Sequence, residues 1–196
     1  MLGKTAASLF WMSRYLERAE NSARFIEAGF RIALTRSASA SDEWSSVLKS
    51  SGVLGAYHAK HDTIESARVI NFLLRDPDNS GSVIALMKQA RDSARTARIA
   101  LTREVWEATN ESWITLKSAM AKPVREQDLP EILGLVRQQS ALVRGATLGT
   151  MLRNDGFNFL RLGTFLERAD STARILDVKY YLLLPSLAQI GSSVDN

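Results

Sequence analysis

The sequence predicts an all-α protein, an antiparallel helical bundle that contains one helix in two copies. Apolar residues recur at spacings of three and four along most of the chain, as they do on one face of an α-helix. The 196 residues include only four prolines, and runs of alternating β-branched residues are missing. A ten-residue segment with a Glu-Arg pair occurs twice. These observations predict two equivalent helices related by a pseudo-two-fold axis.

The first predicted helix spans residues 4–36. Its apolar positions, here called the first seam, alternate between spacings of three and four: Leu9, Met12, Leu16, Ala19, Ala23, Ile26 and Phe30. A Ser-rich link at 37–42 ends this helix. A second helix is expected over 43–59 and is weakened at Gly52 and Gly55, because glycine costs backbone entropy inside a helix.

A short third helix is expected to end at Leu74. Asp62 and Glu65 have the spacing of a capping box, which would start it. The segment 76–81 contains Asp, Pro, Asn and Gly and predicts a turn. A long helix should follow over residues 82–109, and its pattern extends, with or without a break, to 121.

The last third of the chain predicts two more helices after a loop that two prolines bracket. The first covers residues 131–153, and Asn154-Asp155-Gly156 closes it with a glycine just past the helix end. The second spans 157–184 and stops at Pro185. Residues 186–196 are expected to form a loose tail.

The chain length predicts one domain, because domains average roughly 150 residues. We place this domain at residues 1–185, with a first repeat at 1–122 and the start of a second at 123–185. In the first copy, Asp42-Glu43-Trp44 opens another helix after the repeated one, whereas the second copy reaches residue 196 first. The second repeat is therefore expected to be cut short.

The repeat relates residues 15–24 to residues 165–174 at a constant offset of 150. A second seam accompanies the second copy and has the spacing of the first: Phe159, Leu162, Leu166, Ala169, Ala173, Leu176 and Tyr180. The matching seams predict that the two helices are structurally equivalent elements.

The Glu-Arg pairs, Glu17-Arg18 and Glu167-Arg168, lie beside the two seams. In one interpretation they belong to solvated faces that same-helix ion pairs join. These same-helix pairs would be Glu20 with Arg24 and Asp170 with Arg174. In a second interpretation the pairs cross between the helices, Glu17 with Arg168 and Glu167 with Arg18, because partly buried charges persist only when paired.

A ligand or catalytic role is the third interpretation of the same residues. Glu17 and Glu167 would then act as acid and base, and Arg18 and Arg168 would hold a carboxylate or phosphate.

The net charge of +4 arises in one basic segment, residues 88–103. Lys88, Arg91, Arg95 and Arg98 follow at helical spacing and predict one basic face, which is either solvated and paired or a partner-binding surface. Nucleic acid is not the expected partner, because the excess is small and no aromatic residue is interleaved for stacking.

Residue chemistry also limits metal and cofactor sites. The chain has no cysteine and two histidines, which excludes thiolate metal sites, disulfides and cysteine nucleophiles. His58, His61, Asp62 and Glu65 have ligand-like spacing, but their polar segment near a helix end favours surface histidines. We expect neither a metal nor a cofactor. No stretch is long and apolar enough for a membrane span, and the expected location is cytoplasmic.

Three stretches resemble the bacterial Alpha-E family, an all-helical domain named for a Glu-Arg motif. They are residues 8–24; residues 71–76 with 79–80, 90–95, 104–107 and Asn110; and residues 150–156 with 159–163, 165–170 and 176–180. The resemblance implies association with circularly permuted ATP-grasp ligases and transglutaminase-like proteins, in systems that form peptide or amide bonds. It implies no settled catalytic activity. A functional site carried over from the family would consist of Glu17, Arg18, Glu167 and Arg168, followed by Arg24 and Arg174 as further binding candidates.

Two functions therefore follow as expectations. The first is a non-catalytic helical accessory protein that binds the ATP-grasp partner or its peptide substrate through the Glu-Arg helices and the basic face. The alternative is an enzyme or ligand-binding domain that uses the paired Glu-Arg motifs in peptide or amide metabolism. Self-association into a homo-oligomer stays open in both.

Overall fold

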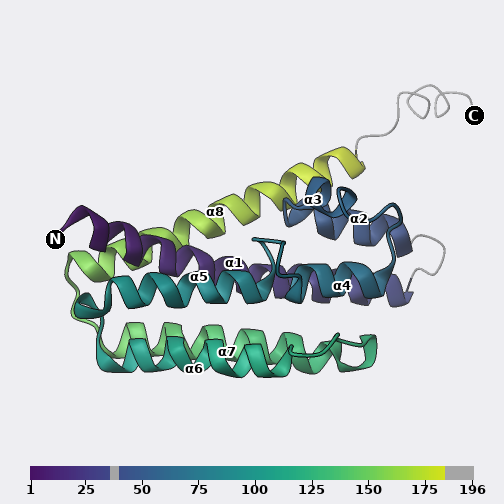
Figure 1. Ribbon diagram of the computed structural model, residues 1–196. Coiled ribbons are helices and arrows are strands. Elements are labelled where there is room, and N and C mark those ends of the chain that lie inside the picture. The colour runs from purple at the N-terminus through teal and green to yellow at the C-terminus, as the bar shows by residue number, and fades with distance from the viewer. Residues whose placement is uncertain (36–39, 184–196) are drawn as a thin grey trace, which may run out of the picture.

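The structure is a computed structural model that describes residues 1–35 and 40–183. In this part of the chain every regular element is a helix, and no strand is present (Figure 1). The helices are α1 (Gly3–Thr35), α2 (Ala40–Ser50), α3 (Leu54–His58), α4 (Ser66–Arg75), α5 (Val83–Thr96), α6 (Arg103–Ala119), α7 (Leu129–Thr150) and α8 (Asp155–Leu183). Two short 3-10 turns lie at Arg98–Ala100 and Glu126–Asp128. The all-α prediction is confirmed.

Helix α1 runs through the middle of the molecule and contacts α5, α7 and α8 (Figure 1). Ion pairs join Glu20 to Arg144 and Glu27 to Arg137, so α1 and α7 run antiparallel. Helix α8 instead runs parallel to α1, because its contacts with α1 keep an offset close to 150 residues. The bundle is thus antiparallel between consecutive long helices, whereas the two copies of the repeat lie parallel.

The core forms along the first seam. Leu9, Met12, Ala19, Ala23 and Ile26 are fully buried, and the other two seam residues are partly buried. Burying a side chain the size of leucine contributes roughly 2 kcal/mol. The seam therefore holds α1 against the helices that follow it in the chain.

The prediction of one long helix after residue 82 is wrong, because the chain folds back between α5 and α6. Leu101 is extended, and the hydroxyl of Thr102 accepts a hydrogen bond from the N–H of Val105, which starts α6. Ala94, Ala97, Leu101 and Val105 all belong to one core cluster. Folding back buries both halves of the apolar pattern against the same neighbours, which a straight helix cannot do.

Two predicted helix boundaries are also wrong. Asp62 and Glu65 form no capping box, since α4 begins after Glu65 and no side chain caps it. Gly156 does not end a helix but lies in the first turn of α8. There Asn154 accepts a hydrogen bond from the N–H of Phe157, so its side chain starts α8 rather than closing α7.

The helix predicted over residues 43–59 is interrupted at its expected weak point. Gly52 adopts a φ of +71°, which suits glycine, and separates α2 from α3. Helix α2 begins at Ala40, earlier than expected, while residues 37–39 of the predicted link lie outside the described residues. The predicted tail at 186–196 also lies outside them.

The second seam differs from the first in its surroundings. Leu162, Leu166 and Leu176 are 49%, 46% and 63% exposed. Helix α8 turns its opposite face, which carries Gly163 and Glu167, towards α1. The two helices are therefore not equivalent in burial, and the pseudo-two-fold axis stays a prediction.

Within the described residues, we find no helix that combines the length and the apolar character needed to cross a membrane.

Candidate functional site

The two Glu-Arg pairs meet where α1 and α8 lie side by side, and they cross. Arg18 donates from Nε to Glu167 Oε1 at 2.6 Å and from Nη2 to Oε2 at 2.9 Å. In the opposite direction, Arg168 donates from Nε to Glu17 Oε1 at 2.6 Å. The structure also contains the same-helix pairs, Arg24 with Glu20 at 2.7 Å and Arg174 with Asp170 at 3.0 Å.

Close packing of the helices brings these charges together. A Cβ on Gly163 would collide with the carbonyl oxygen of Phe10 and the hydroxyl of Ser13, so only glycine lets α8 approach α1 here. Two turns further, Asn21 donates to the Ser171 hydroxyl at 2.8 Å. The Glu-Arg pairs lie between these two contacts.

Both motif carboxylates are buried, Glu17 at 7% and Glu167 at 1% exposure. A buried carboxylate is costly unless charged donors surround it. Glu167 meets this need with two guanidiniums, because Arg14 reaches its Oε2 at 2.8 Å beside Arg18. Around Glu17 the contacts are looser, since its Oε2 is 3.5 Å from Arg168 and 3.7 Å from Arg144.

Sequence reasoning missed Arg14 and Arg144 as members of this network. Arg14 lies one turn before Arg18 on the same face of α1, so the spacing of four residues indicated that both could reach the same partner. Arg144 comes from α7, where it also contacts the buried Glu20 at 2.8 Å. Nothing in the local sequence of α7 indicated that contact.

The crossed pairs keep the guanidiniums charged. The hydrogen bond to Glu167 raises the pKa of Arg18, although partial burial acts in the other direction. The bond to Glu17 raises the pKa of Arg168 in the same way. The guanidinium groups of Arg18 and Arg168 therefore stay charged at neutral pH, as arginine does generally.

A cavity of about 340 Å³ opens on the Arg18–Glu167 side of the helix pair, and we call it the motif cavity. Helices α1 and α8, the α2–α3 turn and the start of α5 enclose it. Its walls are mostly polar, and the apolar part consists of Trp11, Tyr15, Phe25, Val53 and Leu86. A much smaller space of about 60 Å³ lies near Glu17 on the α7 side, beside the buried Ser140.

A family profile described as a predicted alpha-helical domain with a conserved ER motif matches residues 1–195. The chain belongs to the Alpha-E family. Neither the curated proteins nor the solved structures contain a match to it. The sequence holds the ER step only at 17–18 and 167–168, which are the two pairs that the structure joins.

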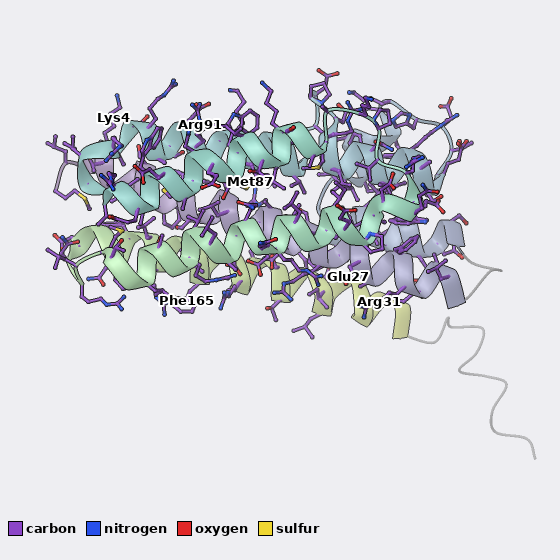
Figure 2. All side chains as sticks on the ribbon, turned by 90° about the horizontal axis from the view of Figure 1, so that it is seen from below. Lys4, Glu27, Arg31, Met87, Arg91 and Phe165 are labelled. Carbon is purple, nitrogen blue, oxygen red and sulfur yellow. The ribbon has the colours of Figure 1, made fainter. Side chains whose placement is uncertain are left out.

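Of the four basic residues predicted to share a face, Lys88, Arg91 and Arg95 keep helical spacing within α5, and Arg98 departs from it. Lys88 and Arg95 both pair with Asp92 on the surface of α5, while Arg91 donates to Asn110 of α6 at 2.7 Å. Arg98 lies beyond the end of α5 because the helix stops at Thr96. In Figure 2, Arg91 lies at the opposite edge of the bundle from Phe165 of α8.

The histidines lie apart from the Glu-Arg network of the Alpha-E chain. His58 and His61 pack against the ring of Tyr57, with centroid distances of 5.9 and 4.7 Å. Within the described residues, no three His, Asp or Glu side chains gather in a way that could hold a metal ion.

Proposed function

We propose that this Alpha-E chain is a non-catalytic accessory protein that binds an ATP-grasp ligase of a peptide- or amide-bond-forming system. A transglutaminase-like protein and a peptide substrate would belong to the same system. The family resemblance supports these partners. The exposed apolar residues of α8 support an interaction role.

One observation carries the proposal, namely the apolar face that α8 turns away from α1. We call it the α8 outward face, and it consists of Leu162, Phe165, Leu166, Ala169, Ala173 and Leu176. In Figure 2, Phe165 lies at the outer edge of the bundle. Contiguous exposed apolar surface of this kind is typical of a protein interface.

The first copy of the repeat indicates what could cover this face. The corresponding residues of α1 include Ala19 and Ala23, which share a core cluster with Leu86 and Met87 of the amphipathic helix α5. Ala169 and Ala173 leave the same room for a close approach. We therefore expect the ligase to contribute an amphipathic helix, with its apolar side on the α8 outward face.

The geometry of the carboxylates favours a non-catalytic role over acid–base catalysis. Both oxygens of Glu167 accept hydrogen bonds from arginines. Glu17 Oε1 is held in the same way by Arg168. A general acid or base needs an oxygen within reach of a substrate proton, and arginines occupy that position at both oxygens of Glu167 and at Oε1 of Glu17.

Co-expression with the ATP-grasp protein, followed by size-exclusion chromatography and an ATP-hydrolysis assay, tests the proposal. We expect co-elution and altered ATP turnover for the wild-type chain. Leu166→Glu should abolish co-elution, whereas Ile99→Glu should keep it. Ile99 is a matched control because it is an exposed apolar residue, at 95%, that lies off the α8 outward face.

Two results would overturn the proposal. Separate elution of the wild-type proteins with unchanged turnover would remove the ligase as the partner. A wild-type homodimer that Leu166→Glu converts to a monomer would assign the α8 outward face to self-association instead.

A further inference from the structure

We infer that the motif cavity binds a small molecule with a single free carboxylate, namely an amino acid or the C-terminal end of a short peptide. This inference deepens the proposed function, on which it rests for the link to peptide chemistry. It assigns the peptide to a defined place between α1, α8 and the α2–α3 turn.

The size of the motif cavity fits such a ligand. Its volume of about 340 Å³ falls in the range of small-molecule sites. Four separate parts of the chain line it, so a bound molecule would contact both copies of the Glu-Arg helix. The cavity also has one apolar wall, where Trp11 stacks on Tyr15 at a centroid distance of 5.5 Å.

Arg14 does not line the cavity, but counted together with the four charged lining residues it leaves one positive charge uncompensated. Arg18 and Arg14 share the single carboxylate of Glu167, while Arg174 pairs with Asp170. One monoanion would balance this cluster. The carboxylate of an amino acid or dipeptide supplies this charge, and its ammonium group can donate to the side-chain oxygens of Asn21 and Gln89. Phosphate is largely a dianion above neutral pH and would then exceed the balance.

Two guanidiniums have donors to spare for that carboxylate. Arg18 uses Nε and Nη2 on Glu167, and its Nη1 makes no hydrogen bond to any described residue. Among the described residues, Arg174 donates only from Nε, to Asp170. Planar guanidinium groups suit carboxylates because two N–H bonds can point at the two oxygens.

Gly52 makes room for Arg174 at the cavity wall. A Cβ at this position would lie 2.8 Å from Nη1 of Arg174. The left-handed backbone at Gly52 also favours glycine. The guanidinium of Arg174 therefore lies against the turn between α2 and α3, at the wall of the cavity.

The remaining polar groups fit the amino or amide nitrogen of the ligand. Asn21 and Gln89 each donate from their amide nitrogen, to Ser171 and to the Ser80 carbonyl. Their side-chain oxygens stay available as acceptors. The buried hydroxyl of Ser51 has no hydrogen-bond partner among the described residues. A plain carboxylic acid would leave these acceptors unused, whereas a peptide N–H would satisfy one.

Isothermal titration of the full chain with the dipeptide alanylphenylalanine tests the inference. Its C-terminal amide and inorganic phosphate serve as comparison ligands. We expect the free dipeptide to bind, the amide to bind at least tenfold more weakly, and phosphate not to bind. Arg174→Gln should weaken dipeptide binding at least tenfold.

Arg24→Gln is the matched control, because Arg24 forms the equivalent same-helix pair in the first copy and does not line the motif cavity. It should bind the dipeptide as the wild type does. A thermal melt of each variant checks that the fold is retained.

Three results would overturn the inference: no dipeptide binding, equal binding of the amide, or phosphate binding that Arg174→Gln removes. The titration needs no ligase, so its outcome is independent of the co-elution experiment. Dipeptide binding without co-elution would leave the cavity assigned and the ligase excluded. Co-elution without dipeptide binding would overturn only the cavity assignment.

Discussion

Arg18 holds Glu167 with two hydrogen bonds, and the residues in the same positions of the other copy, Arg168 and Glu17, form the reverse pair. Each helix therefore supplies one carboxylate and one guanidinium to its parallel neighbour. Both carboxylates are buried, so the packing of α1 against α8 depends on the ion pairs that neutralise them.

Replacing Glu167 with Gln should destabilise the protein by about 3 kcal/mol, because Arg14 and Arg18 then lose their shared counter-charge. Glu17→Gln should cost less, about 2 kcal/mol, since the contacts around Glu17 are looser. Urea unfolding measures both. The exposed pair partner Asp170 is the control, and Asp170→Asn should change stability by about 0.5 kcal/mol or less. Unchanged stability for Glu17→Gln, together with loss of ligase co-elution, would contradict the structural role.

Gly163→Ala should destabilise the protein by about 1–3 kcal/mol, because its Cβ would press on the backbone of α1 at Phe10. Gly145→Ala is the matched control, as nothing lies within 4 Å of a Cβ built there in the middle of α7. That control should gain about 0.5–1 kcal/mol from the higher helix propensity of alanine. Thermal unfolding distinguishes the two, and a stabilised Gly163→Ala variant would show that α8 does not approach α1 this closely.

Arg91→Ala should cost about 1 kcal/mol, because it removes the hydrogen bond that joins α5 to Asn110 of α6. Lys88→Ala and Arg95→Ala should each change stability by about 0.5 kcal/mol or less, since their pairs with Asp92 are on the surface. Denaturant midpoints of the three variants test this ranking. Equal losses in all three would contradict a greater contribution from the hydrogen bond between Arg91 and Asn110.

The stability contributed by Asp76 should depend on pH. Burial raises the pKa of Asp76, but hydrogen bonds from Lys60 and from the N–H of Asp78 outweigh it and hold the pKa below its ordinary value. A lowered carboxyl pKa stabilises the fold above the unfolded value of about 4, and this contribution is lost as the pH falls through the folded value.

The free energy of unfolding should therefore differ most between wild type and Asp76→Asn near neutral pH. The difference should shrink as the pH falls below about 4. Chemical denaturation at a series of pH values measures it. A difference that stays constant from neutral to acid pH would exclude the carboxylate as its source.

Much of the helical pattern could be predicted because it is local. The first seam repeats every three or four residues, so it indicates both α1 and its buried side. The same rule failed between α5 and α6, since Ala94, Ala97 and Leu101 keep the helical spacing across the turn. Spacing alone does not reveal that a chain folds back when both halves bury the same kind of side chain.

The candidate site was predictable only in part. The repeat identified Glu17, Arg18, Glu167 and Arg168, and crossed pairing was one of the interpretations it left open. Arg144 was not predictable, because it comes from α7 and meets Glu20 across the bundle. The motif cavity likewise depends on the α2–α3 turn, which lies more than a hundred residues from α8.

By itself, the sequence determined that the protein is helical, where the repeat lies and which charged residues the two copies share. Only the tertiary structure decided which side of α8 meets α1. The second seam is as regular as the first, yet its Leu162, Leu166 and Leu176 face outward, because Gly163 and the buried carboxylate of Glu167 lie on the side of α8 that meets α1. The spacing of apolar residues depends only on residues a few positions apart. The side of α8 that meets α1 depends on groups about 150 residues apart in the sequence.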